Sequence, residues 1–371
     1  MKKKGHLTYL LSAGHLSADL NQGALPAILP FLITSYHYSF TQAAGLVLAA
    51  NIISSIVQPL FGQIADKKSR PWLMAVGLLL GGTGMASMGF LTNFTALCIA
   101  VAISGLGIAA FHPEAAQMVN KVSDETKKGS GLSIFSFGGN VGFAIGPIIS
   151  TASIMSFGLK GTLVLLIPAL IMCIALFTQS RNLKQASEDH GIAIGLKNTP
   201  KEKDRWMAFS LLSIVVFGRS VVFYGLNTFL ALYWIHILKQ SESFGNTMLS
   251  AFFCIGAVST LIGGKLADRY GFRKIIIISY LILFPSVYLL TLTSNVIVAS
   301  IIVIFAGFSI SMPYSSMVVL GQKYLPNRLG LASGVTLGLA VSVGGIVAPV
   351  LGRLADNHGL LTAIHVLALI A

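Results

Sequence analysis

Long, uninterrupted apolar stretches recur along the whole chain and constrain its fold more than any other feature. Runs of about 18 or more such residues can cross the ~30 Å hydrocarbon core of a membrane as α-helices. A closed β-barrel needs short alternating segments instead, so the sequence predicts an all-α integral membrane protein. We expect eleven full spans, at 8–34, 42–65, 72–91, 94–119, 129–153, 160–180, 206–236, 244–267, 275–293, 295–320 and 329–353. A twelfth begins at about 360 and has too few residues before Ala371 to span, so we expect helix 12 to be truncated in this sequence.

Charged residues are few, and their distribution is informative. Only 10% of the 371 residues are charged and the mean hydropathy is +0.80, which excludes an ordinary soluble domain. If the N-terminus is cytoplasmic, all but four of the 25 lysines and arginines fall on the cytoplasmic side. Three lie on the other side (Lys160, Lys239 and Arg353), and Arg219 lies inside a span. This asymmetry predicts a multi-pass cell-membrane protein with both termini in the cytoplasm, and it explains the net charge of +13 without a nucleic-acid partner.

Three landmarks repeat at nearly one offset. The segment "GQIADKKSRPW" resembles "GKLADRYGFRK", and the shift between Asp66 and Asp268 is 268 − 66 = 202 residues. Pro113 in "FHPEAAQMV" matches Pro313 in "SMPYSSMVV" at 313 − 113 = 200. "NVGFAIGPII" likewise matches "SVGGIVAPVL" further along the chain. A constant offset across separate landmarks indicates a duplication.

The repeat divides the chain into three parts. We expect an N-terminal six-helix bundle at 1–180, a charged cytoplasmic linker at 181–205, and a C-terminal bundle at 206–371 whose last helix is incomplete. Because each half has an even number of spans, both copies have the same orientation and are related by an axis along the membrane normal. This arrangement predicts a central cavity between two bundles and alternating access to it.

The duplicated loop motif has a chemistry suited to a conformational latch. Its glycines allow close helix approach, and its aspartates can accept from backbone N–H groups at a helix N-terminus. Its basic residues keep the loop on the cytoplasmic side of the membrane. The alternative is a solvated turn. "GRLADNHG" at 352–359 looks like a third copy but falls on the outer side, and we do not count it as a latch. The predicted latch residues are Gly62, Asp66, Arg70, Gly264, Asp268 and Arg269.

The span at 129–153 carries a helix-packing motif. Gly138, Gly142 and Gly146 follow i, i+4 and i+8 on one face, and Pro147 adds a kink.

An aspartate lies near the middle of the first span. His15, Asp19, Gln22 and Pro26 share one helix face. A buried, unpaired carboxylate costs at least a few kcal/mol, so Asp19 must have a partner, face a wet cavity or carry a proton. A permanent helix–helix hydrogen bond is the alternative. In the span at 94–119, His112 and Glu114 flank Pro113 and are further candidates for proton coupling.

Arg219 is a candidate partner for Asp19. Subtracting the repeat offset gives 219 − 202 = 17, within one turn of Asp19 in the other half. Its planar fork of donors also suits an anionic substrate, and a purely structural ion pair is the third possibility. Other polar residues expected to line the substrate cavity are Gln22, Asn51, Gln58, Asn140, Tyr224, Asn227 and Tyr314.

These motifs together carry a family resemblance. The latch loops resemble the signature of the major facilitator superfamily. "GHLSADLNQG", "QPLFGQIADKKSRPW", "FHPEAAQ" and "SIFSFGGNVGFAIGP" are similar to its fosmidomycin-resistance branch. The glycine motif that ends at Pro147 also resembles one found in drug/proton antiporters. The resemblance implies a proton-driven drug exporter, with roles for Asp19, His112, Glu114 and, in the latch, Asp66.

Three functions are compatible with the sequence. The first is a proton-coupled antiporter that exports a small drug or metabolite, with a fosmidomycin-like anion as one possible substrate. The second is an importer or facilitator of the same fold. The third is an intramembrane enzyme with a metal site built from two histidines and two carboxylates, for which a duplicated latch has no use. No G-x-x-x-x-G-K-[ST] loop occurs, so we expect a proton gradient as energy source, no cofactor or metal, and a monomer in the lipid bilayer.

Overall fold

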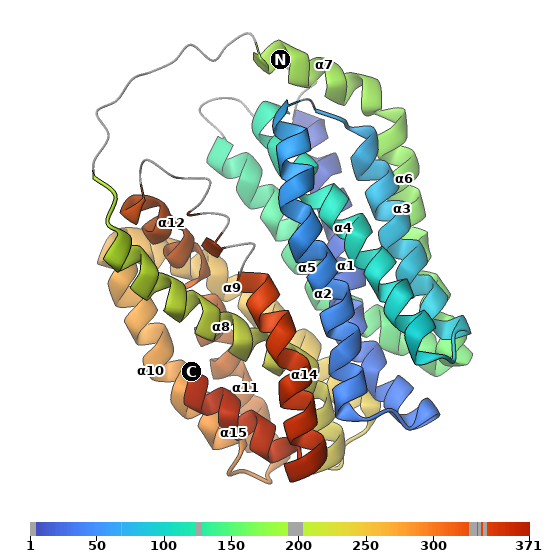
Figure 1. Ribbon diagram of the computed structural model, residues 1–371, viewed down its shortest axis with the longest axis vertical. Coiled ribbons are helices and arrows are strands. Elements are labelled where there is room, and N and C mark those ends of the chain that lie inside the picture. Colours follow the sequence, from blue (N-terminus) through green and yellow to red (C-terminus); the bar gives the residue numbers. More distant parts are fainter. Residues whose placement is uncertain are drawn as a thin grey trace. The chain divides into compact units, whose positions relative to one another are not determined.

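The structure is a computed structural model that describes residues 5–67, 69–122, 128–191, 203–325 and 340–371, together with residues 332, 335 and 336. Every regular element in these ranges is a helix (Figure 1). They group into two compact units, Met1–Leu25 with Ala49–Thr199, and Pro26–Leu48 with Pro200–Ala371. The predicted division at a central linker stays a prediction. In these units, residues 26–48 group with the second half of the chain.

Two long helices begin the chain and contribute to both units. They are α1 (Gly5–Tyr36), which contains Pro26 and Pro30, and α2 (Phe40–Lys67). The other helices of the first unit are α3 (Trp72–Ser87), η1 (Met88–Phe90), α4 (Phe94–Val122), α5 (Lys128–Phe157), η3 (Gly158–Leu165), α6 (Leu166–Thr178) and α7 (Ser180–Gly191).

The second unit contains the remaining helices. These are α8 (Trp206–Leu232), η4 (Tyr233–Ile237), α9 (Glu242–Tyr270), α10 (Phe272–Leu290), α11 (Val296–Ser311), α12 (Tyr314–Tyr324), α14 (Ala340–His358) and α15 (Leu360–Ile370). Side-chain caps start several of them. Asn295 accepts from Ile297 and Val298 N–H at the start of α11, and Ser241 accepts from Phe244 N–H at the start of α9.

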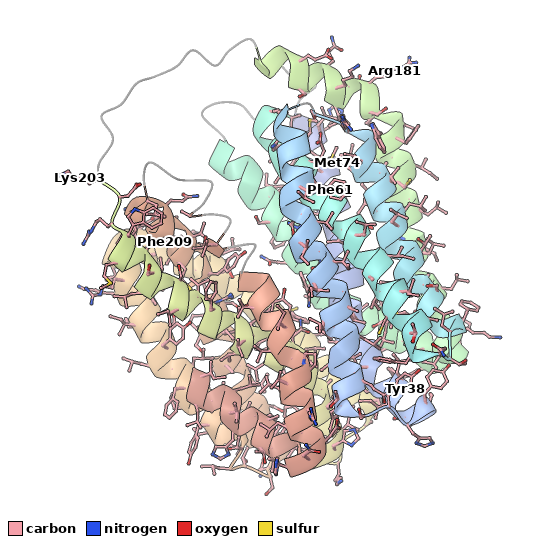
Figure 2. All side chains as sticks on the ribbon, in the orientation of Figure 1. Tyr38, Phe61, Met74, Arg181, Lys203 and Phe209 are labelled. Carbon is pink, nitrogen blue, oxygen red and sulfur yellow. The ribbon has the colours of Figure 1, made fainter. Side chains whose placement is uncertain are left out.

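Two segments differ from the sequence-based expectation. The first part of the polar linker is the helix α7, whose Leu183 and Ala186 are buried against the first unit, while Arg181 is exposed (Figure 2). The span predicted at 295–320 is two helices, α11 and α12, separated at Pro313 because proline cannot continue the backbone hydrogen bonding.

By length and composition, eight stretches of the described chain are apolar enough to cross a membrane. Helix α1 is long enough at 32 residues but is not among them, because its polar residues lower its hydropathy.

Each unit has its own apolar interior. In the first, Leu11 of α1, Met74 of α3, Phe111 of α4 and Leu176 of α6 belong to one buried cluster. Met74 is labelled in Figure 2. In the second, residues of α8, α10 and α12 meet in another, which contains Leu212, Ile276 and Met317. Most of the buried polar side chains in the described ranges are Ser or Thr, and several of these donate to a carbonyl oxygen of the preceding turn. Among them, Asp19 and Glu114 are the buried charged side chains.

Candidate functional site

Helix α5 lies directly against α1 because glycines leave room for the α1 backbone. A Cβ atom on Gly138, Gly142 or Gly146 would lie 2.2, 2.3 or 2.4 Å from the carbonyl oxygens of Ser12, Leu16 and Leu20. Both sets of residues are spaced by four, so one face of α5 follows one face of α1. Pro147 comes directly after this contact, inside α5.

Asp19 lies between two histidines in the first unit. Its Oδ2 is 3.1 Å from His15 Nε2, one turn earlier on α1, and its Oδ1 is 3.1 Å from His112 Nε2 on α4. Asp19 is buried and both histidines are half-buried. The two predicted spans therefore bring together three of the four proposed proton-coupling residues.

The hydrogen bonds of His15 define how many protons the cluster holds. Its Nδ1 is 2.8 Å from the carbonyl oxygen of Phe135, which can only accept, so Nδ1 carries a hydrogen. Nε2 and the Asp19 oxygen must then share another proton, either as imidazolium and carboxylate or as imidazole and carboxylic acid. With His112 Nε2–H donating to Oδ1, both arrangements have no net charge. The cluster can therefore gain or lose one proton and change its net charge.

Two residues of α5 shape the space around this cluster. Phe135 stacks on the His15 ring with a centroid distance of 4.0 Å and an interplanar angle of 15°. Gly139 faces the carboxylate, since a Cβ atom there would lie 2.4 Å from Asp19 Oδ2 and 2.5 Å from His15 Cε1. Only glycine fits at position 139 with this arrangement.

The same three side chains are the ones that could hold a metal ion within the described part of the chain. One ligand atom from each of His15, Asp19 and His112 lies within 4.8 Å of the others. Glu114 is not in this group, so the four-residue metal site considered from the sequence does not form. The shared proton accounts for the contacts of Asp19 without a metal.

Glu114 has a different set of partners. Its carboxylate is buried and its Oε1 accepts from the Ser69 hydroxyl and from Arg70 N–H at 2.8 Å. These donors lie in the turn between α2 and α3. Its Oε2 is buried and makes no hydrogen bond with the residues described. Glu114 therefore bonds to the turn that follows α2, and its role in proton coupling stays a prediction.

Arg219 on α8 lies among aromatic side chains in the second unit. Its Nε donates to the carbonyl oxygen of Ile310 at 2.7 Å, next to the break at Pro313. Its guanidinium carbon is 4.9 Å from the ring centroid of Tyr314 and 5.6 Å from that of Phe223. Among described residues, no carboxylate lies within ion-pair distance of Arg219. The predicted pair with Asp19 stays a prediction, since the two residues belong to different units.

The other predicted substrate residues are distributed over both units. Gln22, Asn51, Gln58 and Asn140 are half-buried in the first unit. In the second, Tyr224 is half-buried and packs edge-on against Phe223 at 5.5 Å between centroids. Asn227 is buried, and its side-chain carbonyl finds no hydrogen-bond partner in the described ranges.

The predicted latch residues are only partly visible. The surroundings of Gly62 and the side chain of Asp66 are outside what the structure describes, and Arg70 is exposed. Asp268 and Arg269 are exposed, and the Arg269 guanidinium stacks on Tyr270. Nothing described lies within 4 Å of a Cβ built on Gly264. The close approach occurs one residue earlier, where a Cβ on Gly263 would lie 2.0 Å from the Met312 carbonyl oxygen.

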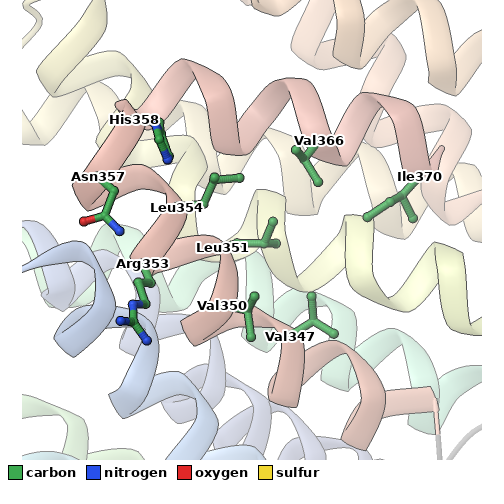
Figure 3. Close-up of a pocket in the computed structure, with 9 residues that line it drawn as sticks. All are labelled: Val347, Val350, Leu351, Arg353, Leu354, Asn357, His358, Val366 and Ile370. Carbon is green, nitrogen blue, oxygen red and sulfur yellow. The ribbon is translucent and has the colours of Figure 1, made fainter.

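A groove of about 350 Å³ lies between α14 and α15 (Figure 3). Arg353, Asn357 and His358 line one end of it, and its other lining residues are aliphatic. It contains none of the predicted proton or substrate residues, so we do not assign the substrate to it.

The sequence does not indicate three contributors to these sites. Phe135 contributes its backbone carbonyl oxygen, which no sequence pattern reports. Gly139 is next to Gly138 of the glycine motif but does not share its four-residue spacing. Gly263, and not the expected Gly264, is the residue of close approach.

The fold and these sites define a class: a membrane protein whose described elements are all helices, with repeated sequence landmarks and an ionisable group inside each half. The sequence profile of the Major Facilitator Superfamily matches residues 11–370, and the chain belongs to this family. The family and its structural neighbours are transporters, so this protein is a transporter and not an enzyme.

Relatives and solved structures agree with this assignment. The chain is 30% identical to the uncharacterised MFS-type transporter YfnC of Bacillus subtilis, over 97% of this chain and 90% of YfnC. It is 28% identical to the fosmidomycin resistance protein of Escherichia coli, over 94% and 86%. A bacterial homologue of the human lysosomal transporter Spinster has a TM-score of 0.83 at 14% identity, over 100% of this chain and 95% of that one. The xylose transporter XylE of E. coli has a TM-score of 0.77 at 14% identity, over 99% and 93%.

Proposed function

We propose that this protein is a proton-coupled antiporter that exports a small organic anion by alternating access. The His15–Asp19–His112 cluster carries the proposal, because His15 and the buried carboxyl group of Asp19 share one proton, with no lysine or arginine beside them in the described part of their unit. Intramembrane ionisable residues with this kind of partner are typical of proton relays.

The cluster acts as the proton carrier. A proton arriving from outside converts the neutral arrangement to a positive one. When this proton binds Asp19 Oδ1, the contact of that oxygen with His112 exchanges its donor and acceptor roles. Because Asp19 is on α1 and His112 is on α4, this exchange alters the hydrogen bonding between the two helices. Release of the proton to the cytoplasm restores the neutral arrangement.

Arg219 binds the anionic group of the substrate. Its Nε is already used by Ile310, and its two terminal amino groups make no hydrogen bond with described residues, so they are available to an oxyanion. Two relatives have names that indicate small organic anions: the fosmidomycin resistance protein of E. coli and, at 26% identity, the 4-hydroxybenzoate transporter PcaK of Pseudomonas putida. Fosmidomycin is a phosphonate and is the probe we choose.

We also propose that the protein lies in the cytoplasmic membrane as a monomer with both termini in the cytoplasm. It uses the proton gradient without a cofactor or metal, and its partners are protons and a small molecule.

Inverted membrane vesicles test this function. With an acidic lumen, the wild-type protein is expected to accumulate labelled fosmidomycin, since protons leave as the drug enters. Asp19→Asn is expected to reduce this uptake to that of membranes lacking the protein, because an amide cannot carry the proton. Glu188→Gln, which neutralises an exposed carboxylate on α7, is the matched control and is expected to behave as wild type.

The same vesicles separate the alternatives. Proton-driven uptake that persists in Asp19→Asn contradicts the proposal. Accumulation only in right-side-out vesicles indicates an importer instead. Uptake that a chelator abolishes and Zn²⁺ restores assigns the cluster to a metal and removes its role as proton carrier.

A further inference from the structure

Asp356, at the C-terminal end of α14, binds the first turn of α2. Its Oδ1 accepts from Phe40 N–H at 2.8 Å, and its Oδ2 accepts from Thr41 N–H at 2.9 Å and from the Thr41 hydroxyl. All of these residues belong to the second compact unit. A carboxylate at a helix N-terminus is stabilised both by the free N–H groups and by the helix dipole.

This contact completes the cap of α2. Ser39 and Gln42 form a reciprocal capping box, in which Gln42 N–H donates to the Ser39 hydroxyl at 3.1 Å and Ser39 N–H donates to Gln42 Oε1 at 3.0 Å. Phe40 and Thr41 supply the remaining free amides of the first turn. Asp356 is therefore the acceptor that these two amides use instead of water.

The segment that carries Asp356 is a third copy of the latch motif. "GKLADRYG" at 264–271 and "GRLADNHG" at 352–359 share the pattern G-(K/R)-L-A-D-x-x-G. Both end in a glycine with left-handed φ, 93° at Gly271 and 88° at Gly359, and a helix follows directly. A Cβ on Gly352 would lie 2.7 Å from the Phe40 carbonyl oxygen, so the first residue of the motif allows the close approach. The chemistry expected of a latch is thus present at Asp356.

Other contacts hold the same N-terminal segment to the second half. The Thr34 hydroxyl donates to Glu242 Oε1 at 2.9 Å, and Asn246 Nδ2 donates to the Ala27 carbonyl oxygen at 3.0 Å. Residues 26–48 are thereby tied to α9 and α14, while the rest of α1 and α2 packs with the first unit. A movement of one unit against the other must strain the shared helices or break these ties.

We propose that Asp356 is a releasable cap that fixes the start of α2 on α14 and lets it go at one stage of each transport cycle. Its side chain is exposed, so water can replace it at the two amides at small cost. Pro26 and Pro30 allow α1 to bend where it changes units. Asp356 acts as a positioning residue for the start of α2, which follows α1, the helix that carries His15 and Asp19. The inference depends on alternating access and not on the proposed substrate or on proton coupling.

Hydrogen exchange tests the cap. In Asp356→Ala, the Phe40 and Thr41 amides are expected to exchange about tenfold faster than in wild type, because their acceptor is gone. Asp356→Asn, whose amide oxygen still accepts, is expected to lie between the two. Asn357→Ala, one residue further on α14, is the matched control and leaves exchange unchanged. Equal exchange in Asp356→Ala and wild type overturns the cap.

A reversible cross-link tests release. Thr41→Cys with Asp356→Cys, in a variant without Cys98, Cys173 and Cys254, places two thiols at the cap. Fosmidomycin uptake is expected to stop on oxidation and to return on reduction. In each single-cysteine variant, the oxidant is expected to leave the uptake rate unchanged. Oxidised protein that transports as fast as reduced protein shows a permanent cap and overturns release.

The two experiments separate this inference from the proposed function. If the reduced protein does not move fosmidomycin, the proposed substrate fails. Release is then read from a second signal, the protection of the Phe40 and Thr41 amides in the cysteine-free protein. If these amides exchange only when the whole protein unfolds, release is overturned. If they exchange at a lower denaturant concentration than the buried amides of α8, release is supported.

Discussion

The two interior charges are stabilised in different ways. Asp19 has an imidazole at each carboxylate oxygen, so its charge can be cancelled by a proton that stays within the cluster. Arg219 contacts a backbone carbonyl oxygen and two aromatic rings. These contacts lower the free-energy cost of burying the guanidinium but leave its positive charge in place. A site that changes charge and a site that keeps it suit a proton and an anion, respectively.

Replacing Arg219 by Lys tests the anion site at the residue scale. Lysine keeps the positive charge but loses the Nε donor to Ile310 and the planar fork. We expect the KM for fosmidomycin to rise about tenfold, with the maximal rate little changed, because a bidentate contact made in the bound state is lost. Arg353→Lys, outside the proposed site, is the control. An unchanged KM in Arg219→Lys removes this residue from substrate binding.

At the scale of helices, proline breaks and glycine contacts place these groups. Pro113 follows His112 in α4, and its repeat partner Pro313 separates α11 from α12 beside Ile310 and Tyr314. The glycine contact of α5 with α1 also has a counterpart, since a Cβ on Gly344 of α14 would lie 2.5 Å from Tyr224 Cδ2 on α8. This glycine contact thus occurs in both halves, while the ionisable residues Asp19 and Arg219 occur in one half each.

Gly139→Ala tests the packing of α5 around the cluster. The added methyl would lie 2.4 Å from Asp19 Oδ2, so the carboxylate must move away from a histidine. We expect a loss of proton-driven uptake and a destabilisation of about 1–3 kcal/mol in thermal unfolding. Gly81→Ala is the control, because its nearest neighbour is Ile108 Cγ1 at 3.6 Å and alanine favours the helix. Wild-type uptake by Gly139→Ala would show that the geometry of the cluster is not needed.

For the whole molecule, much of the fold follows from the sequence because the membrane makes each span nearly independent of its neighbours. Apolar length predicts where a helix crosses, and the repeated landmarks around Asp66, Pro113 and Pro147 predict the duplication. The interior charges at Asp19 and Arg219 are visible for the same reason, since a costly residue in an apolar run requires an explanation.

The partners of those residues could not be predicted, because they depend on which helices meet. His112 was a candidate, but nothing in the sequence indicates that it contacts the oxygen of Asp19 that His15 leaves open. Glu114 was a candidate for proton coupling, but nothing in the sequence indicates that it accepts from the turn at Ser69 and Arg70. The "GRLADNHG" segment has the right residues for a latch, but its partner is the start of α2, more than 300 residues away in the chain.

Drug-driven proton movement in proteoliposomes tests the central claim most directly. With equal pH on both sides, external fosmidomycin is expected to make the lumen of wild-type proteoliposomes more alkaline, since each drug molecule that enters is exchanged for protons. In Asp19→Asn liposomes the luminal pH is expected to stay constant. A drug-dependent alkaline shift of wild-type size in Asp19→Asn would contradict the account, and so would an acid shift in the wild type, which indicates symport.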